Sequence, residues 1–155
     1  MIQHKGHEGH KGKTLTALTL VSLVSLVFIV SAQNAPAPRT LDKGDRSNIH
    51  STRMVVLRTA DEWQALWAQH APERQRPAVD FSREMVVGVF LGTKPTAAYG
   101  VAVLSTIDGG GALLVKYRVA EPPSGTITAQ VITYPYHLAA VPIAKSTDVR
   151  FEKVP

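Results

Sequence analysis

The chain has 155 residues and a formal net charge of +5, and 45% of its residues are hydrophobic while 19% are charged. These values exclude a fully disordered chain and fit one globular domain with a single core. Acidic residues interrupt the basic ones along the chain, so the clustered basic face that nucleic acid binding requires is missing.

The first 32 residues have the features of a secretory signal peptide. A polar, lysine-containing stretch precedes an apolar segment at residues 15–30, and small residues follow up to Ala32. This apolar segment is shorter than the roughly 20 residues that cross a bilayer. We expect cleavage after Ala32 and a periplasmic or secreted location in a bacterial envelope, with retention as a membrane anchor as the alternative. Because the chain has no cysteine, we expect neither lipid attachment at a signal cysteine nor disulfide bonds.

Residues 33–48 are interpreted as a flexible linker. They begin with the small, Pro-rich sequence QNAPAP and continue into polar residues typical of turns. We therefore place a single β-rich domain at residues 49–155.

A strand and an amphipathic helix are predicted at the start of this domain. Residues 53–58 (RMVVLR) are rich in β-branched side chains and bounded by charge, as in a short strand. Thr59 and Glu62 fit the capping box that begins helices. The large side chains that follow recur at helical spacing, in the order Trp63, Leu66, Trp67 and His70. We expect this stripe to pack on a sheet and Pro72 to end the helix.

Further strands are predicted over the rest of the domain. Residues 84–91 (EMVVGVFL) form a continuous apolar run that suits a central strand buried on both faces. Segments 99–107 and 113–119 are separated by a glycine-rich tract that permits a hairpin. In residues 126–134, Ile127, Ala129 and Val131 alternate with polar side chains, which predicts another strand. The last predicted strands are residues 137–143 and 147–151.

Six or seven strands and one helix predict a mainly β, α+β fold. We expect an antiparallel β-sandwich, or a curled, barrel-like sheet, with the amphipathic helix packed against it.

The sequence contains no recognisable catalytic, metal or cofactor site. It has no cysteine nucleophile and no G-x-S-x-G motif, and only three histidines follow position 32. His50 falls in a predicted loop, His70 is interpreted as a cation near the helix C-terminus, and His137 as a partner in a structural hydrogen bond. We predict that the protein is not an enzyme and uses neither a cofactor nor a metal. A site that the fold assembles from distant residues is the alternative.

Several segments together resemble the C-terminal domain of the PrcB family, whose members are subunits of bacterial surface protease complexes. They are EWQALW at residues 62–67, VDF at 79–81, MVVGVFLG at 85–92, TKPTAAY at 93–99, the turn at 122–125 and TYPYH at 133–137. The family pattern has two glycines where this chain has Ala97 and Ala98. The resemblance implies a non-catalytic, exported domain that is an accessory or stabilising partner of an extracytoplasmic protease.

The loop at residues 95–99 supplies an alternative function. It is also similar to a loop of chagasin-type cysteine-protease inhibitors, so inhibition of a protease through Pro95 to Tyr99 is a second hypothesis. A small ligand held in a cavity of the sheet is a third. The residues predicted to contact a protein partner are Lys94, Pro95, Thr96, Tyr99, Tyr134, Tyr136 and His137. The sequence does not define the oligomeric state.

Overall fold

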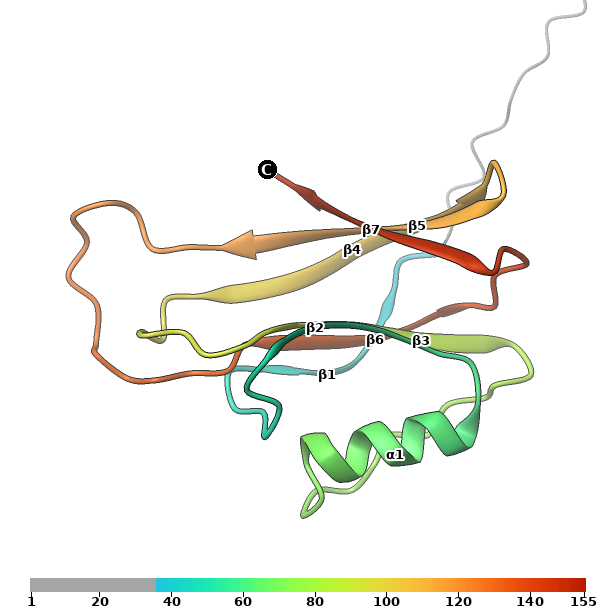
Figure 1. Ribbon diagram of the computed structural model, residues 1–155, viewed down its shortest axis with the longest axis horizontal. Helices are drawn as coiled ribbons and strands as arrows, with labels where there is room; N and C mark the ends of the chain where they lie inside the picture. The colour runs from blue at the N-terminus through green and yellow to red at the C-terminus, as the bar shows by residue number, and fades with distance from the viewer. Residues whose placement is uncertain (1–35) are drawn as a thin grey trace, which may run out of the picture. The chain divides into compact units, whose positions relative to one another are not determined.

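The computed structural model describes residues 36–155, which form two β-sheets and one α-helix (Figure 1). The predicted signal peptide, with its cleavage site after Ala32, lies outside the described residues. No helix within residues 36–155 is long and apolar enough to cross a membrane.

The two sheets pack face to face as a β-sandwich. In spatial order, the larger sheet consists of β1 (Arg39–Gly44), β6 (Tyr136–Pro142), β3 (Glu84–Leu91) and β2 (Thr52–Leu57). The smaller sheet consists of β4 (Gly100–Gly109), β5 (Ala112–Ala120) and β7 (Asp148–Val154). All neighbouring strands are antiparallel except β5 and β7, which are parallel. The sheets do not close into a barrel, so the predicted sandwich is confirmed.

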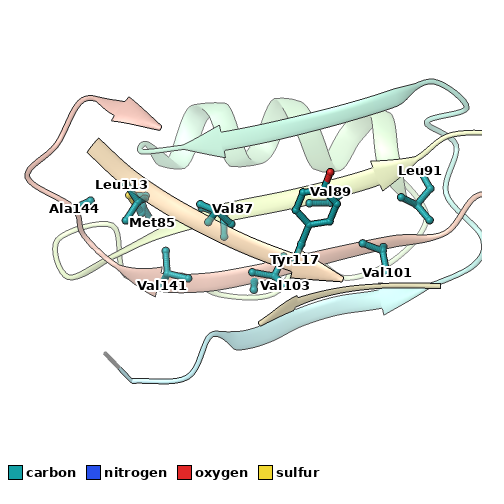
Figure 2. Close-up of a cluster of buried hydrophobic side chains, with 12 residues drawn as sticks. Met85, Val87, Val89, Leu91, Val101, Val103, Leu113, Tyr117, Val141 and Ala144 are labelled. Atoms are coloured by element: carbon teal, nitrogen blue, oxygen red, sulfur yellow. The ribbon is translucent and has the colours of Figure 1, made fainter. Parts of the chain in front are cut away.

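The main hydrophobic core lies between the two sheets. Figure 2 shows its side chains, which come from β3, β4, β5, β6 and the segment after β6. On β3, Met85, Val87 and Val89 belong to this core. Val86 and Phe90 point to the opposite face and belong to a second cluster that includes the helix. The strand is therefore buried on both faces, as its continuous apolar run predicts.

Helix α1 (Ala60–His70) covers the outer face of the larger sheet (Figure 1). The predicted capping box is present: the Thr59 hydroxyl accepts a hydrogen bond from the Glu62 amide at 3.2 Å, and the Glu62 carboxylate accepts one from the Thr59 amide at 3.1 Å. The predicted stripe is buried along its whole length, comprising Trp63, Leu66, Trp67 and His70. The sequence thus located both the start of the helix and its buried face.

The interpretation of residues 33–48 as a flexible linker is wrong for Arg39–Gly44, because these residues form strand β1. This strand pairs with β6 from Arg39 opposite Ala140 to Gly44 opposite Tyr136. It is an edge strand whose side chains are mostly exposed, so the backbone pairing leaves no hydrophobic pattern in the sequence.

The strand predicted at residues 126–134 is also absent. Of these residues, only Thr133 forms a β-bridge, with Lys94. The alternation of Ile127, Ala129 and Val131 does not correspond to a buried face, because the Ile127 side chain is 99% exposed. The pattern satisfies the local requirement for a strand, but no strand of the sandwich pairs with it.

Candidate functional site

Three connections meet at one end of the sandwich, at residues 45–51, 92–99 and 121–135 (Figure 1). We call this surface the loop end. Backbone hydrogen bonds fasten the connections to each other: the Lys94 and Thr133 amides each donate to the other residue's carbonyl, at 2.8 and 2.9 Å. The Tyr134 amide donates to the carbonyl of Asp45 at 2.8 Å. The three loops therefore form one connected surface.

The predicted partner loop at residues 94–99 is folded onto its neighbours. Thr96 is buried, its carbonyl accepts a hydrogen bond from the Thr133 hydroxyl at 2.9 Å, and its own hydroxyl accepts one from the Ala98 amide. The Lys94 ammonium lies 5.2 Å from the centre of the Tyr99 ring, a cation–π distance. Pro95 is exposed. Most of the loop is thus held in place by contacts within the domain.

The two predicted tyrosine contacts have different surroundings. Tyr134 is half-buried at the loop end, where its ring stacks on His50 with centroids 4.0 Å apart and planes 14° from parallel. Tyr136 is buried in β6, and so is the neighbouring His137. The structure brings Lys94, Pro95, Thr96, Tyr99 and Tyr134 to the loop end and places Tyr136 and His137 inside the domain.

The most exposed apolar side chains of the loop end lie in the 121–135 connection. Ile127 is 99% exposed, Ile132 is 64% and Val131 is 51%. The sequence does not indicate that these side chains are exposed, because the alternation of Ile127 and Val131 with polar residues predicts a paired strand instead. Exposed apolar side chains on a connected loop surface are suited to contact with another protein.

A second constellation of polar groups lies where β1, the end of α1 and β6 meet. The Asp42 carboxylate accepts hydrogen bonds from both Nη atoms of Arg74, at 3.1 and 2.6 Å, and from the Tyr136 hydroxyl at 3.0 Å. His70 places Nε2 2.9 Å from the same carboxylate and Nδ1 2.8 Å from the hydroxyl oxygen of Ser47. We call these five residues the Asp42 cluster. The sequence predicted His70 as a helix cap, whereas its ring is buried in this cluster.

The charge states in the Asp42 cluster follow from burial and hydrogen bonding. Burial raises the pKa of Asp42, but hydrogen bonds from Arg74, His70 and Tyr136 outweigh it and hold that pKa below its usual value. Burial lowers the pKa of His70, against the opposing effect of Asp42. Because an ionised carboxylate can only accept, His70 donates from Nε2 to Asp42 and accepts at Nδ1 from Ser47.

Ser47, His70 and Asp42 therefore have the hydrogen-bond order of a catalytic triad. Their burial distinguishes them from an active one: Ser47 is 3% exposed and His70 is 1% exposed. The Ser47 oxygen also accepts a hydrogen bond from the Ile49 amide at 3.0 Å. A substrate cannot reach this hydroxyl in the folded domain, so the cluster joins β1 to the helix and β6. Residues 36–155 contain no group of three or more His, Asp or Glu side chains that could hold a metal.

One known protein family matches part of this chain. A family model described as PrcB C-terminal matches residues 85–142, which extend from β3 through β6. The match confirms the resemblance to the PrcB C-terminal domain that the sequence landmarks predict. Comparisons with curated proteins and with solved structures found no match.

Proposed function

We propose that this chain is an exported, non-catalytic domain that binds an extracytoplasmic protease as an accessory or stabilising partner. The observation that carries the proposal is the match of residues 85–142 to the PrcB C-terminal domain, because this resemblance implies membership of a protease complex. The signal-peptide pattern of residues 1–32 supports export to the periplasm or the medium.

The loop end supplies a surface suited to such a partner. It presents Ile127, Val131 and Ile132 to solvent in the same connection that carries the half-buried aromatic ring of Tyr134. Apolar and aromatic groups at the centre of an interface contribute most of the binding energy in protein complexes. Backbone hydrogen bonds at Lys94, Thr133 and Tyr134 fasten the three loops to each other at the base of this surface before binding.

The geometry gives less support to the alternatives. Insertion of Pro95 to Tyr99 into a protease cleft would require a protruding loop, whereas Thr96 is buried and Tyr99 is covered by Lys94. For a small ligand, a surface pocket of about 540 Å³ lies beside the start of β1 and β3. Its lining includes the ion pair between Arg39 and Glu84, with nitrogen and oxygen 2.6 Å apart, and it is not a closed apolar cavity.

An affinity capture from the envelope of the protein's own host tests the proposal. The bait is the protein as the host makes it, and bound proteins are identified by mass spectrometry. A double variant, Ile127→Lys with Ile132→Lys, should reduce recovery of the partner at least tenfold. The matched control is Ile107→Lys with Ile143→Lys, since these side chains are 51% and 50% exposed and lie outside the loop end.

The expected result is stoichiometric recovery of a secreted protease with the wild type and the control variant, but not with the loop-end variant. A longer lifetime of the protease in the complex would identify a stabilising subunit, and a slower protease would identify an inhibitor. Reproducible failure to recover any protease would reject the proposal.

A further inference from the structure

We propose that residues 126–132 bind the partner by strand addition, pairing with an exposed edge strand of that protein. The inference rests on the proposed function for the identity of the partner, and it adds the binding mode and the segment responsible. The match to the PrcB C-terminal domain does not specify either of these.

The composition of the segment is that of a strand without a neighbour. Its sequence, TITAQVI, is rich in the β-branched residues that favour extended backbone. In the described structure these residues form no strand, and the Ile127 side chain is almost fully in solvent. A protein that docks beside the segment would therefore meet exposed apolar side chains on a sequence that favours extended backbone.

The backbone of the segment has free hydrogen-bonding capacity. Among the described residues, the only backbone hydrogen bonds donated from within it run from Thr126 to Pro123 and from Val131 to Ala129. The amides of residues 127–130 and 132 have no protein acceptor within residues 36–155. In an extended strand, successive amides point to opposite edges, so a partner strand would accept from alternate residues of the segment. The bond from Val131 to Ala129 would open when the segment becomes extended.

A local turn precedes the segment, and contacts with two other loops fix its C-terminal end. At one end, the bond from Thr126 to Pro123 closes a turn in which Gly125 has a φ of 80°, a conformation that favours glycine. At the other end, Thr133 is bridged to Lys94, and the Tyr134 ring stacks on His50. The turn and the fixed C-terminal end both lower the entropy lost when the segment is ordered in a complex.

The edge strands of a second copy of this chain are poor partners for the segment. Residues 122–134 contain no Asp, Glu, Lys or Arg, so they complement an uncharged edge strand. The edge strand β7 carries Asp148, Arg150, Glu152 and Lys153, and an uncharged segment would leave these groups unpaired or desolvated.

The other three edge strands, β4, β1 and β2, also have features that oppose pairing with another strand. On β4, the Val103 amide already donates to His137, and the pairing with β5 shifts register between Val103 and Ser105. On β1 the register shifts between Thr40 and Asp42. On β2, the exposed Arg53 donates to Gln69 of the helix at 3.1 Å. Charges and bulges of this kind prevent edge strands from joining copies of one protein.

Nuclear magnetic resonance with a defined peptide tests strand addition without a protease. The protein, labelled with ¹⁵N, is titrated with a capped heptapeptide of alternating threonine and valine. The control is the same peptide with N-methyl groups on alternate residues, which removes the donors from one edge. We expect amide shifts and slowed hydrogen exchange at residues 127–132, and shifts at least tenfold smaller with the methylated peptide. Absence of shifts in this segment, or shifts confined to β2 or β7, would overturn the inference.

A proline substitution provides the matched test in the protein. Thr128→Pro removes one free amide and should weaken peptide binding at least tenfold, while Thr128→Ser should bind like the wild type. Equal binding by both variants contradicts strand addition.

Protease capture that survives Thr128→Pro would reject strand addition and leave the proposed function standing. Peptide binding without protease capture would support strand addition and reject the protease as partner. Sedimentation of the free wild type as a dimer that Thr128→Pro dissociates would overturn the choice of a different protein.

Discussion

The imidazole of His137 joins the two sheets of the sandwich through the backbone of Val103. Its Nδ1 accepts a hydrogen bond from the Val103 amide on β4 at 2.7 Å, although His137 itself lies on β6 in the other sheet. Since Nδ1 accepts, Nε2 carries the proton and donates to the Thr40 hydroxyl at 2.9 Å. Burial lowers the pKa of His137 to about 4, so the ring is neutral over the range in which it makes these bonds.

This contact predicts a loss of stability in mild acid. In the unfolded chain His137 protonates near pH 6.5, whereas in the folded domain it resists protonation until about pH 4. As pH falls from 6.5 to 4, the unfolded state binds more protons, and the free energy of unfolding should decrease by about 3 kcal/mol. Urea denaturation at several pH values measures this change. His137→Gln should flatten most of it. An unchanged slope in His137→Gln would assign the acid sensitivity to other groups, beginning with His70, whose pKa is also lowered by burial.

Asp42→Asn should destabilise the domain by about 2–3 kcal/mol, because it removes the charged acceptor shared by the buried His70 and Tyr136 and the more exposed Arg74. Asp42 receives hydrogen bonds from Arg74 and Tyr136 and faces the ring of His70. Chemical denaturation at pH 7 gives the free energy of unfolding. The control is Asp148→Asn, whose exposed pair with Arg150 should be worth less than about 1 kcal/mol. Equal effects of the two variants would show that the Asp42 cluster adds no stability.

Gly88→Ala should cost about 1–3 kcal/mol, because the larger sheet has no room for a side chain at this point. Gly88 lies on β3 between β2 and β6, and an added Cβ would be 2.5 Å from Leu138 Cδ2 and 2.9 Å from Val55 Cγ2. Thermal unfolding followed by circular dichroism measures the effect. The matched variant Gly109→Ala adds its Cβ in open space and should unfold near the wild-type temperature.

Ile127→Ser should change the free energy of unfolding by less than about 0.5 kcal/mol, because the side chain makes almost no contact within the folded domain. Leu138→Ala, in the second cluster, should cost about 2–5 kcal/mol in the same denaturation experiment. A large effect of Ile127→Ser would mean that the isoleucine packs against the domain in solution. That result would remove the basis for using this residue to probe partner binding alone.

Elements with a strong hydrophobic pattern could be predicted from the sequence. The apolar run of β3 and the spacing of Trp63 and Trp67 both reflect burial against neighbours, and burial is recorded in residue type. β1 could not be found in this way, because its pairing with β6 uses backbone groups that all residues share. The strand predicted at residues 126–134 failed for the converse reason, since its side-chain pattern is present but the pairing partner is not.

The candidate site was predictable only in part. The structure brings Lys94 and Tyr134 to one surface, where Lys94 is bridged to Thr133 and the Tyr134 ring stacks on His50. Their contact with a partner stays a prediction. Tyr136 and His137 were predicted beside them, but neighbours in a strand point to opposite faces, and both faces of β6 are covered. The Asp42 cluster assembles residues between positions 42 and 136, and no local spacing indicates that they meet.

The pairing of β1 with β6 also bears on how fast the domain folds. Thr40 and His137, which contact each other across this pair, are separated by 97 positions. In the larger sheet, β2 and β3 are the only neighbouring strands that are also consecutive in the chain. Proteins dominated by such distant contacts fold slowly, because most of the loop-closure entropy is lost before the contacts form. We therefore expect the pairing of β1 with β6 to be a slow step in folding. Slow pairing of this strand suits the export that we propose, because a chain that has not finished folding can still pass through a translocation channel.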